Sequence, residues 1–508
     1  MRRFIALLVG VSGLVPASGM PLRSVLFVDG ATSPRGRLQV VGMAETGGAP
    51  GSFTLVADLG TGRYRQDIIT GPVGERSGYD GAPWQWHDGI LVSVDMAGAV
   101  ADARAQAFLL RYGWRDPAAR PFLRPLGTTS IEGKSADRVA VRLPGASPID
   151  LWFAQGSRQL LQAVVHGDAG AVVTRLSDWR VVAGVSLAFR REERDATGQN
   201  SVFITRSASF VSPSASDLAR PRPVRRGSFI GTPQPVPFIL DHGERGHIVV
   251  PAQLNGRPAQ LVFDTGAANY FTPDVAKAYG LTVSGGVAIG GVGSSSITGG
   301  YARVGELTIG SAGLRQSAAM VAPLPEAATH PRPGLTLQGL TGFEFLAEFR
   351  TTIDYGRRTI SFASADAPFP GGKGSVPFRS DGHGIYIEAV IEGRRGWFRV
   401  DTGDSGTVTL FRRFAAVNGL GGDATSRTSA AEVGGALTTR LKTLASISLA
   451  GVTFHDVRAE ISEQNAGAFG SASAAGNIGA GILSRFRVVI DYPAKRLMFS
   501  PLSPDPGL

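Results

Sequence analysis

A tandem repeat in the second half of the chain constrains its fold more than any other feature. The segment Leu261-Val262-Phe263-Asp264-Thr265-Gly266 recurs as Phe398-Arg399-Val400-Asp401-Thr402-Gly403, so the two Asp-Thr-Gly tripeptides lie 137 residues apart. Ile353 and Ile490, each followed by Asp-Tyr, have the same spacing. Self-similarity at a fixed spacing is typical of duplicated structural units. The sequence therefore predicts two lobes of like topology.

The local signals around each tripeptide also match. Before Asp264, an extended segment at 247–254 and an Asn255-Gly256 pair, which favours a tight hairpin turn, lead into a second strand. After it, Thr272 is expected to cap a helix that ends before Gly280. The second lobe has the corresponding parts at 386–391, Glu392-Gly393, 397–400 and a helix at 410–418, and the lobes close with hairpins at 351–362 and 488–499.

The first half of the chain predicts an antiparallel β domain. A helical stretch from Met96 to Tyr112, ended by Gly113, is expected to cover one face of its sheet. Apolar runs between turn residues indicate strands at 138–143, 149–154, 160–165, 172–179, 185–190 and 202–206. Aromatic side chains on such strands are more often core, with a ligand groove as the alternative. The tryptophans concerned are Trp84, Trp86, Trp114, Trp152 and Trp179.

Composition sets the fold class and the boundaries. The 68 glycines and the scarcity of helical periodicity predict a mainly β protein. Met1-Arg2-Arg3, an apolar run and then small residues form the pattern of a secretory signal, so we expect a periplasmic or secreted protein. The expected divisions are a signal peptide at 1–19, a β-rich domain at 20–210, a Pro/Ser/Arg-rich linker at 211–235, and lobes at 236–370 and 371–508.

A formal net charge of +10 raises the question of nucleic-acid binding. The basic residues are mostly scattered, and they cluster only between Arg220 and Arg226, within the predicted linker. We therefore expect no nucleic-acid partner. The chain has no cysteine, so neither a disulfide framework nor a lipidation cysteine is expected, and membrane association is not required.

Two Asp-Thr-Gly turns that face each other suggest a specific chemistry. Glycine permits a tight turn after a buried strand, and the threonine hydroxyl can hydrogen-bond to the facing copy. Two carboxyl groups at hydrogen-bonding distance cannot both ionise, so they share one proton and can hold a water between them. Asp264 and Asp401 are the candidate pair, with Thr265, Gly266, Thr402 and Gly403 as supports of the turns.

Residues 236–500 resemble two retropepsin-like domains fused in tandem, as in a pepsin-like aspartic protease. The motifs that carry the resemblance are LVFDTGAAN, FRVDTGDSG and the apolar-Gly segments Gly339-Leu340-Thr341-Gly342-Phe343 and Gly476-Asn477-Ile478-Gly479-Ala480. It implies that Asp264 and Asp401 are catalytic and that the shared proton activates a water for peptide hydrolysis. The N-terminal half resembles the half-barrels of periplasmic lipoprotein-carrier proteins.

Two positions depart from the family pattern. The residue after the glycine is usually Ser, Thr or Ala; Ala267 fits, whereas the second lobe has Asp404. A third carboxylate would either raise the proton affinity of the pair or turn away to solvent. Arg399 replaces an apolar residue and is expected on the outer face of its strand. Because Ala267 supplies no hydroxyl donor, we predict a less acidic optimum than pepsin has.

A flap that covers the substrate is expected between 287 and 300, with Ile289, Gly290, Gly291, Val292 and Gly293 as its candidate residues. Two other hydrolase chemistries receive little support. Gly403-Asp404-Ser405-Gly406 matches the surroundings of a serine nucleophile, but no histidine lies in a recognisable partner motif. No metal-ligand spacing occurs either, so no metal or cofactor is expected.

The sequence thus predicts an exported aspartic endopeptidase that acts on a peptide or protein substrate. Since one chain supplies both aspartates, a monomer is sufficient for catalysis. The alternative is a periplasmic peptide- or lipid-binding protein with a protease-like fold that does not cut. Asp404 is the feature on which the two hypotheses differ most.

Overall fold

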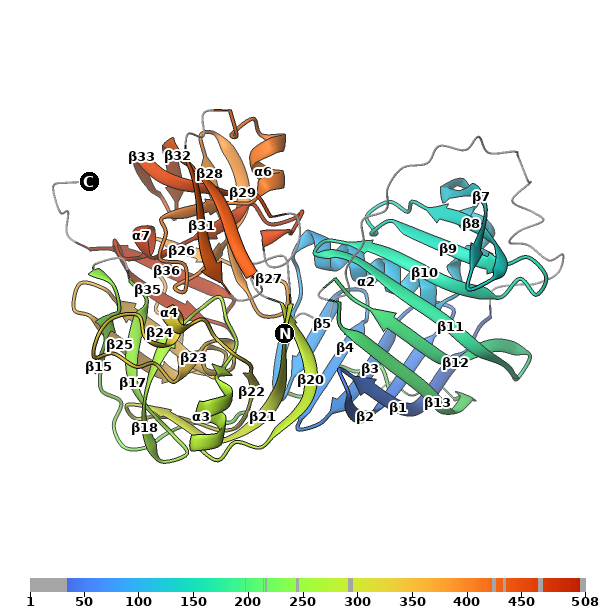
Figure 1. The fold of residues 1–508 in the computed structure, drawn as a ribbon, viewed down its shortest axis with the longest axis horizontal. Helices are drawn as coiled ribbons and strands as arrows, with labels where there is room; N and C mark the ends of the chain where they lie inside the picture. Colours follow the sequence, from blue (N-terminus) through green and yellow to red (C-terminus); the bar gives the residue numbers. More distant parts are fainter. Residues whose placement is uncertain are drawn as a thin grey trace.

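The computed structural model describes residues 34–502, apart from 197, 213, 215–216, 244–245, 291–295, 423–425, 433–434 and 465–468. The predicted signal peptide therefore lies outside the described residues. Within the described part, no helix is both long and apolar enough to span a membrane. The prediction of a mainly β protein is confirmed, and the N-terminal sheet lies beside two smaller β lobes (Figure 1).

The N-terminal half forms one antiparallel sheet in the order β6-β5-β4-β3-β2-β1-β13-β12-β11-β10-β9-β8-β7. Its first and last strands pair at the centre, with Arg37 opposite Val211 and Thr46 opposite Ser201. The outer strands are therefore β6 and β7, and α2 (Ala97–Leu110), which lies between them in sequence, packs against one face of the sheet.

The strands of this sheet are β1 (Arg37–Thr46), β2 (Ala49–Asp58), β3 (Tyr64–Thr70), β4 (Val73–Tyr79), β5 (Pro83–His87), β6 (Ile90–Ser93), β7 (Leu123–Ile131), β8 (Lys134–Val141), β9 (Ile149–Ala154), β10 (Leu160–Gly167), β11 (Gly170–Val182), β12 (Val185–Arg194) and β13 (Asn200–Val211). Two short 3₁₀ helices, Gly113–Arg115 and Pro117–Phe122, follow α2.

The C-terminal end of α2 differs from the prediction. Tyr112, with φ 54°, is the left-handed residue after the helix, and Gly113 begins the next turn instead. Gly113 is required there for a different reason, because a Cβ atom would lie 2.2 Å from the ring of Phe108. Gly113 thus lies near the end of the helix, as predicted, but its role is to allow close packing rather than to adopt a positive φ.

The tryptophans divide between the two predicted roles. Trp84 and Trp86 are buried core residues. Trp114 and Trp179 line an apolar cavity of about 160 Å3 between α2 and the sheet, together with side chains such as Phe189.

The two lobes have matching topologies. In each, the strand that ends at the Asp-Thr-Gly turn pairs in parallel with a short strand from the apolar-Gly segment: β18 with β23 in lobe 1 (236–370) and β29 with β34 in lobe 2 (371–508). The sheet orders are β14-β22-β19-β23-β18-β17-β21-β20 and β27-β28-β29-β34-β30-β33-β32-β31.

Lobe 1 contains β16 (Ile239–Leu240), β17 (Ile248–Leu254), β18 (Arg257–Phe263), β19 (Tyr270–Phe271), α3 (Pro273–Ala278), β20 (Val283–Gly290), β21 (Ser296–Ile309), β22 (Ala312–Val321), α4 (Glu326–Thr329), β23 (Gly339–Thr341) and α5 (Phe343–Leu346). Lobe 2 contains β27 (Arg379–Ser380), β28 (Ile385–Ile391), β29 (Arg394–Val400), β30 (Val408–Leu410), α6 (Arg412–Val417), β31 (Arg427–Glu432), β32 (Gly435–Leu449), β33 (Val452–Ser462), β34 (Gly476–Ile478) and α7 (Ala480–Leu483).

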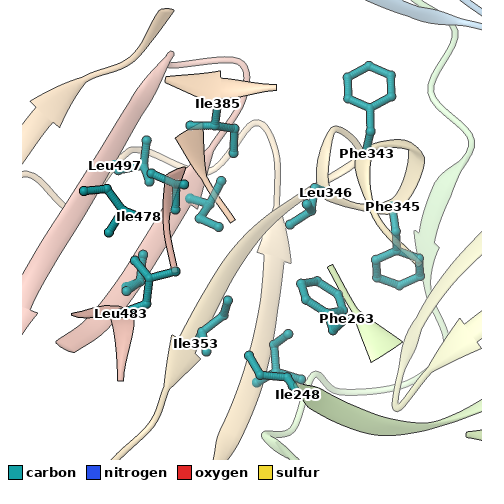
Figure 2. Close-up of a cluster of buried hydrophobic side chains, with 14 of the residues drawn as sticks. Ile248, Phe263, Phe343, Phe345, Leu346, Ile353, Ile385, Ile478, Leu483 and Leu497 are labelled. Carbon is teal, nitrogen blue, oxygen red and sulfur yellow. The ribbon is translucent and has the colours of Figure 1, made fainter. Parts of the chain in front are cut away.

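The hairpins that close the lobes join into a third sheet, in the order β15-β25-β24-β35-β36-β26. Its central pair is antiparallel, with Thr351 opposite Ile490. Apolar side chains from both lobes meet in one buried cluster, in which Phe263 and Phe345 of lobe 1 and Ile385 and Leu483 of lobe 2 are members (Figure 2). The strands are β15 (Val236–Pro237), β24 (Phe349–Asp354), β25 (Thr359–Ser364), β26 (Ser375–Pro377), β35 (Phe486–Asp491) and β36 (Arg496–Pro501).

The predicted linker contains a short strand, and it forms hydrogen bonds and ion pairs with the N-terminal domain and with lobe 1. Within it, β14 (Gly227–Phe229) pairs antiparallel with β22 of lobe 1. Two of its arginines are paired with the N-terminal domain, Arg220 with Asp80 and Arg226 with Asp88, and Arg225 is paired with Asp366 of lobe 1. Asp88 also pairs with Arg303 on β21. The basic cluster is therefore largely used in contacts within the chain.

Candidate active site

The two Asp-Thr-Gly turns begin where a buried central strand ends. Each aspartate is fixed through its backbone by the parallel neighbour strand: Asp264 N donates to Thr341 O at 2.9 Å, and Asp401 N donates to Ile478 O at 3.0 Å. The apolar-Gly segments of the sequence supply both acceptors. The turns thus follow strand ends that are buried, at 261–263 in β18 and 398–400 in β29.

Thr265 and Thr402 connect the turns reciprocally. The Thr265 hydroxyl donates to Val400 O at 2.7 Å and accepts from Thr402 N at 3.0 Å. The Thr402 hydroxyl makes the mirror-image pair with Phe263 O at 2.7 Å and Thr265 N at 3.0 Å. Both threonines are buried. A hydroxyl that donates to and accepts from backbone of the opposite lobe fixes the distance between the lobes at the turns.

The carboxyl groups face each other across this junction. A Cβ atom on Gly266 would lie 2.5 Å from Asp401 Oδ1, and one on Gly403 would lie 2.3 Å from Asp264 Oδ2. Each glycine therefore leaves the space in which the opposite carboxyl group sits. Within its own lobe, each carboxylate accepts from the glycine amide, Asp264 from Gly266 at 2.7 Å and Asp401 from Gly403 at 3.1 Å.

Burial and the facing charge favour the protonated state of this pair. Burial, followed by the neighbouring Asp264 carboxylate, raises the pKa of Asp401 to about 7. Burial also raises the pKa of Asp264, opposed by the Gly266 amide and by its hydrogen bond with Asp401. Both carboxyl groups therefore hold a proton more readily than an exposed aspartate does.

Asp404 is turned inward rather than to solvent. Its Oδ1 accepts from Gly406 N at 2.8 Å, and its Oδ2 accepts from the Thr409 hydroxyl at 3.0 Å. Burial, followed by the charge of Asp401, raises the pKa of Asp404 to about 6. Of the two orientations left open by the sequence, the structure has the inward one, in which the charge of Asp401 acts on the Asp404 carboxyl group.

Asn477 links Asp404 to the pair and was not singled out from the sequence. Its Nδ2 donates to Asp401 Oδ2 at 3.0 Å and to Asp404 Oδ2 at 3.4 Å. The corresponding residue of lobe 1 is Leu340. An amide in an otherwise apolar segment, where the first copy has leucine, was a signal that comparison of the two copies could have found.

The expectation that Arg399 lies on an outer face is wrong. Arg399 is 6% exposed, and its Nη1 lies 3.9 Å from Asp401 Oδ2. Its Nη2 donates to the Tyr386 hydroxyl at 3.4 Å, which in turn donates to Asp381 Oδ2 at 2.9 Å. Although burial opposes the charge, Tyr386 and Asp401 hold the pKa of Arg399 above its ordinary value. A buried arginine is tolerated because these groups compensate its charge.

Lobe 1 supports its turn with a different set. Asn269 Oδ1 accepts from the Thr341 hydroxyl at 3.0 Å, and Asn269 N donates to Glu344 Oε2 at 2.7 Å. Burial raises the pKa of Glu344 to about 7. Ala267, beside this network, accepts from Phe343 N at 2.8 Å through its carbonyl oxygen. Neither Asn269 nor Glu344 was predicted: Asn269 ends the quoted motif LVFDTGAAN but is not repeated in the second copy, which has Gly406 there, and Glu344 lies outside the motif.

The predicted flap residues are only partly described. Ile289 and Gly290 form the end of β20, which pairs antiparallel with β21, Ile289 opposite Ile297. Gly291, Val292 and Gly293 lie outside the described residues. We call the β20–β21 hairpin the flap hairpin below.

The two lobes resemble a known protein family. Residues 250–345 and 387–483 each match the aspartyl protease family model, one match for each lobe. No curated protein sequence matches the chain.

Similar solved structures include an aspartic proteinase from Irpex lacteus, with 15% identity, a TM-score of 0.32, and coverage of 54% of this chain and 98% of that one. A retropepsin-like aspartic protease from Rickettsia conorii has 20% identity, a TM-score of 0.19, and coverage of 25% and 87%. A LolA superfamily protein from Nitrosomonas europaea has 15% identity, a TM-score of 0.28, and coverage of 39% of this chain and 96% of that one.

Proposed function

We propose that the chain is an exported aspartic endopeptidase in which Asp264 and Asp401 activate a water molecule between them. The observation that carries the proposal is the reciprocal contact of the two turns, which brings the two carboxyl groups face to face from separate lobes. The match of both lobes to the aspartyl protease family supports it.

In the proposed reaction Asp401 carries the proton of the resting pair, and Asp264 is ionised. The water oxygen attacks the peptide carbonyl carbon while Asp264 takes a proton from the water. Asp401 gives its own proton to the carbonyl oxygen. The tetrahedral intermediate collapses when the amine leaves with the proton held by Asp264 and one hydroxyl of the intermediate returns its proton to Asp401, which gives the carboxylic acid product and restores the resting pair. No covalent intermediate with the enzyme forms. The Thr265–Thr402 contact keeps the carboxyl groups in place during both proton transfers.

A library of peptides, incubated with and without pepstatin, tests this function. We expect fragments from the unmodified protein, fewer with pepstatin, and none with the Asp264→Asn variant. Fragments that persist in Asp264→Asn and in the presence of pepstatin would rule out an aspartic mechanism. The proposed export is tested separately. Cells that express the full chain are fractionated, and the protein should be found outside the cytoplasm.

A second candidate function is binding without cleavage. The apolar cavity of about 160 Å3 between α2 and the N-terminal sheet favours it, since such a cavity fits part of an apolar ligand. In the library experiment, peptides that are retained intact, with no fragments and no effect of pepstatin, would favour this binding protein over the protease.

A further inference from the structure

The N-terminal domain contacts lobe 2 through a short extended segment just before α2. Met96 has φ −66° and ψ 135°, which is an extended conformation. Asp95 N and Met96 N donate to Ser380 O at 2.9 and 3.2 Å, and Ser380 N donates to Asp95 Oδ1 at 2.7 Å. Ser380 ends β27, the first strand in the order of the lobe 2 sheet. An extended segment is thus hydrogen-bonded to an edge strand.

The side chain of Met96 is 2% exposed and lies in an aromatic pocket of lobe 2. It shares one buried cluster with Tyr386, Phe411, Phe469 and Ala474, which we call the Met96 pocket. Phe411 and Phe469 are stacked, with ring centroids 4.9 Å apart. Methionine fits such a pocket because its flexible thioether packs well against aromatic rings.

The Met96 pocket is one side chain away from the candidate dyad. Tyr386, in its wall, accepts a hydrogen bond from Arg399, which lies 3.9 Å from Asp401. Ala474 and Ala475 precede β34, whose Asn477 donates to Asp401. A side chain in this pocket therefore lies beside the residues that surround one of the two carboxyl groups.

We propose that Met96 occupies, within the chain, a substrate-binding pocket of lobe 2, and that this pocket takes a large apolar side chain of an extended peptide. Backbone hydrogen bonds to an edge strand together with a side-chain pocket are the general means by which extended peptides are recognised. Asp95 and Met96 show both features. The inference rests on the proposed function, because it assigns the pocket to the substrate of that same site.

Further contacts hold the N-terminal domain against both lobes. On the flap hairpin, Gly286 N donates to Gly47 O at 2.6 Å and Ala288 N to Gln199 Oε1 at 2.5 Å. On lobe 2, Asp168 accepts from the hydroxyls of Ser471 at 2.6 Å and Ser473 at 2.9 Å. A substrate must therefore displace the N-terminal domain from the pocket before its own apolar side chain can enter.

Peptide binding to the full chain tests the pocket without reliance on turnover. In an Asp264→Asn background, we compare Met96→Asp with Met43→Asp, a control at a methionine of the same domain that is 42% exposed. The probes are the heptapeptide Ser-Val-Asp-Met-Ala-Gly-Ala, which reproduces residues 93–99, and its Met→Asp counterpart. We expect the Met peptide to bind Met96→Asp at least about tenfold more tightly than Met43→Asp, because a charged residue vacates the pocket. Equal affinities, or an equal gain by both peptides, would overturn the proposal.

A crosslink provides a second test that leaves the pocket residues unchanged. The chain has no cysteine, so Asp168→Cys with Ser473→Cys introduces two thiols at a pair of positions in contact between the N-terminal domain and lobe 2, which oxidation or a short bifunctional thiol reagent joins. We expect the oxidised protein to cleave peptides at least about tenfold more slowly than the reduced protein, and each single variant to be insensitive to reductant. Equal rates with the crosslink verified by mass spectrometry would contradict the inference. If no variant cleaves at all, the proposed function fails, and the peptide titration still decides whether the pocket binds apolar side chains.

Discussion

Asp401 is surrounded by groups that act on its proton in opposite directions. Burial and the Asp264 carboxylate favour the protonated form, whereas Arg399 and the Gly403 amide favour the ionised form. Asp401 and Asp404 also interact through their charges, and the charge of Asp401 raises the pKa of Asp404. Because the proposed reaction needs one proton on the pair, activity should fall as the pH rises through the pKa of Asp401, at about 7. Asp404 is therefore expected to adjust the pH range of activity.

The Asp404→Asn variant tests this role. Loss of the neighbouring charge lowers the pKa of Asp401, so the alkaline fall in kcat/KM should move to lower pH by about 0.5 to 1 unit. The pH dependence of peptide cleavage measures the shift, with the exposed Asp274→Asn as a matched control. A fall that stays in place would show that Asp404 does not act on the pair, and one that moves to higher pH would contradict the predicted direction of its effect.

The raised pKa of Glu344 leads to a prediction about how the stability of the fold depends on pH. Its pKa is raised to about 7 in the folded protein, compared with about 4.3 in an unfolded chain. Between these values the folded state binds more protons, so its stability falls as the pH rises from about 4 to about 7. Glu344→Gln, which keeps the acceptor for Asn269 N, should stabilise the protein at pH 8 by up to about 3 kcal/mol and have no effect near pH 4. Urea unfolding at both pH values measures it, and an equal effect at the two would contradict the prediction.

At the residue scale, the sequence led to the two aspartates and to the residues of their turns, but not to the contacts that Arg399, Asn477 and Glu344 make around them. Asp264 and Asp401 belong to a repeated motif, which is visible without a structure. Arg399 was placed wrongly because alternation along a strand assumes one solvated face, whereas Phe398, Arg399 and Val400 are all buried in β29. Its partners Tyr386 and Asp381 come from elsewhere in the lobe, and no local pattern indicates them.

At the scale of elements, the turns and their threonines connect the two lobes. Each threonine hydroxyl makes two hydrogen bonds to backbone groups of the opposite turn, and all of these groups are buried. Thr265→Val or Thr402→Val keeps the shape of the side chain but leaves both backbone partners unpaired. We expect each variant to lose about 2 to 4 kcal/mol of stability, while Thr→Ser at either position loses much less. Unfolding midpoints equal to that of the unmodified protein would show that the contact is not stabilising.

Elements with local signals were predicted well. Thr272 caps α3 by accepting from Val275 N, and Asn255-Gly256 has the two positive φ angles of the expected hairpin turn. Partner choice between distant strands was not predictable in the same way. Nothing in the runs around Ile353 and Ile490 indicates that the closing hairpins join into one sheet, because periodicity shows which face is buried and not which strand lies beside it.

At the scale of the whole molecule, the two lobes share a core and the N-terminal domain contacts both. The buried cluster that contains Phe263 and Ile385 crosses the boundary between the lobes (Figure 2). The N-terminal domain binds the flap hairpin on one side and lobe 2 on the other, through Gly47 and Asp168 among others. Asp264 and Asp401 are therefore brought together by the packing of the two lobes, and the proposed role of the N-terminal domain is to control access to them.

The most direct test of the central claim is the peptide-cleavage kcat/KM of Asp264→Asn, Asp401→Asn and the double variant, with Asp274→Asn as control. Two carboxyl groups that act as one unit predict that each single variant loses about 10³-fold or more and that the double variant loses no more than either single one. A single variant that retains activity within about tenfold of the unmodified protein would contradict the shared role of Asp264 and Asp401.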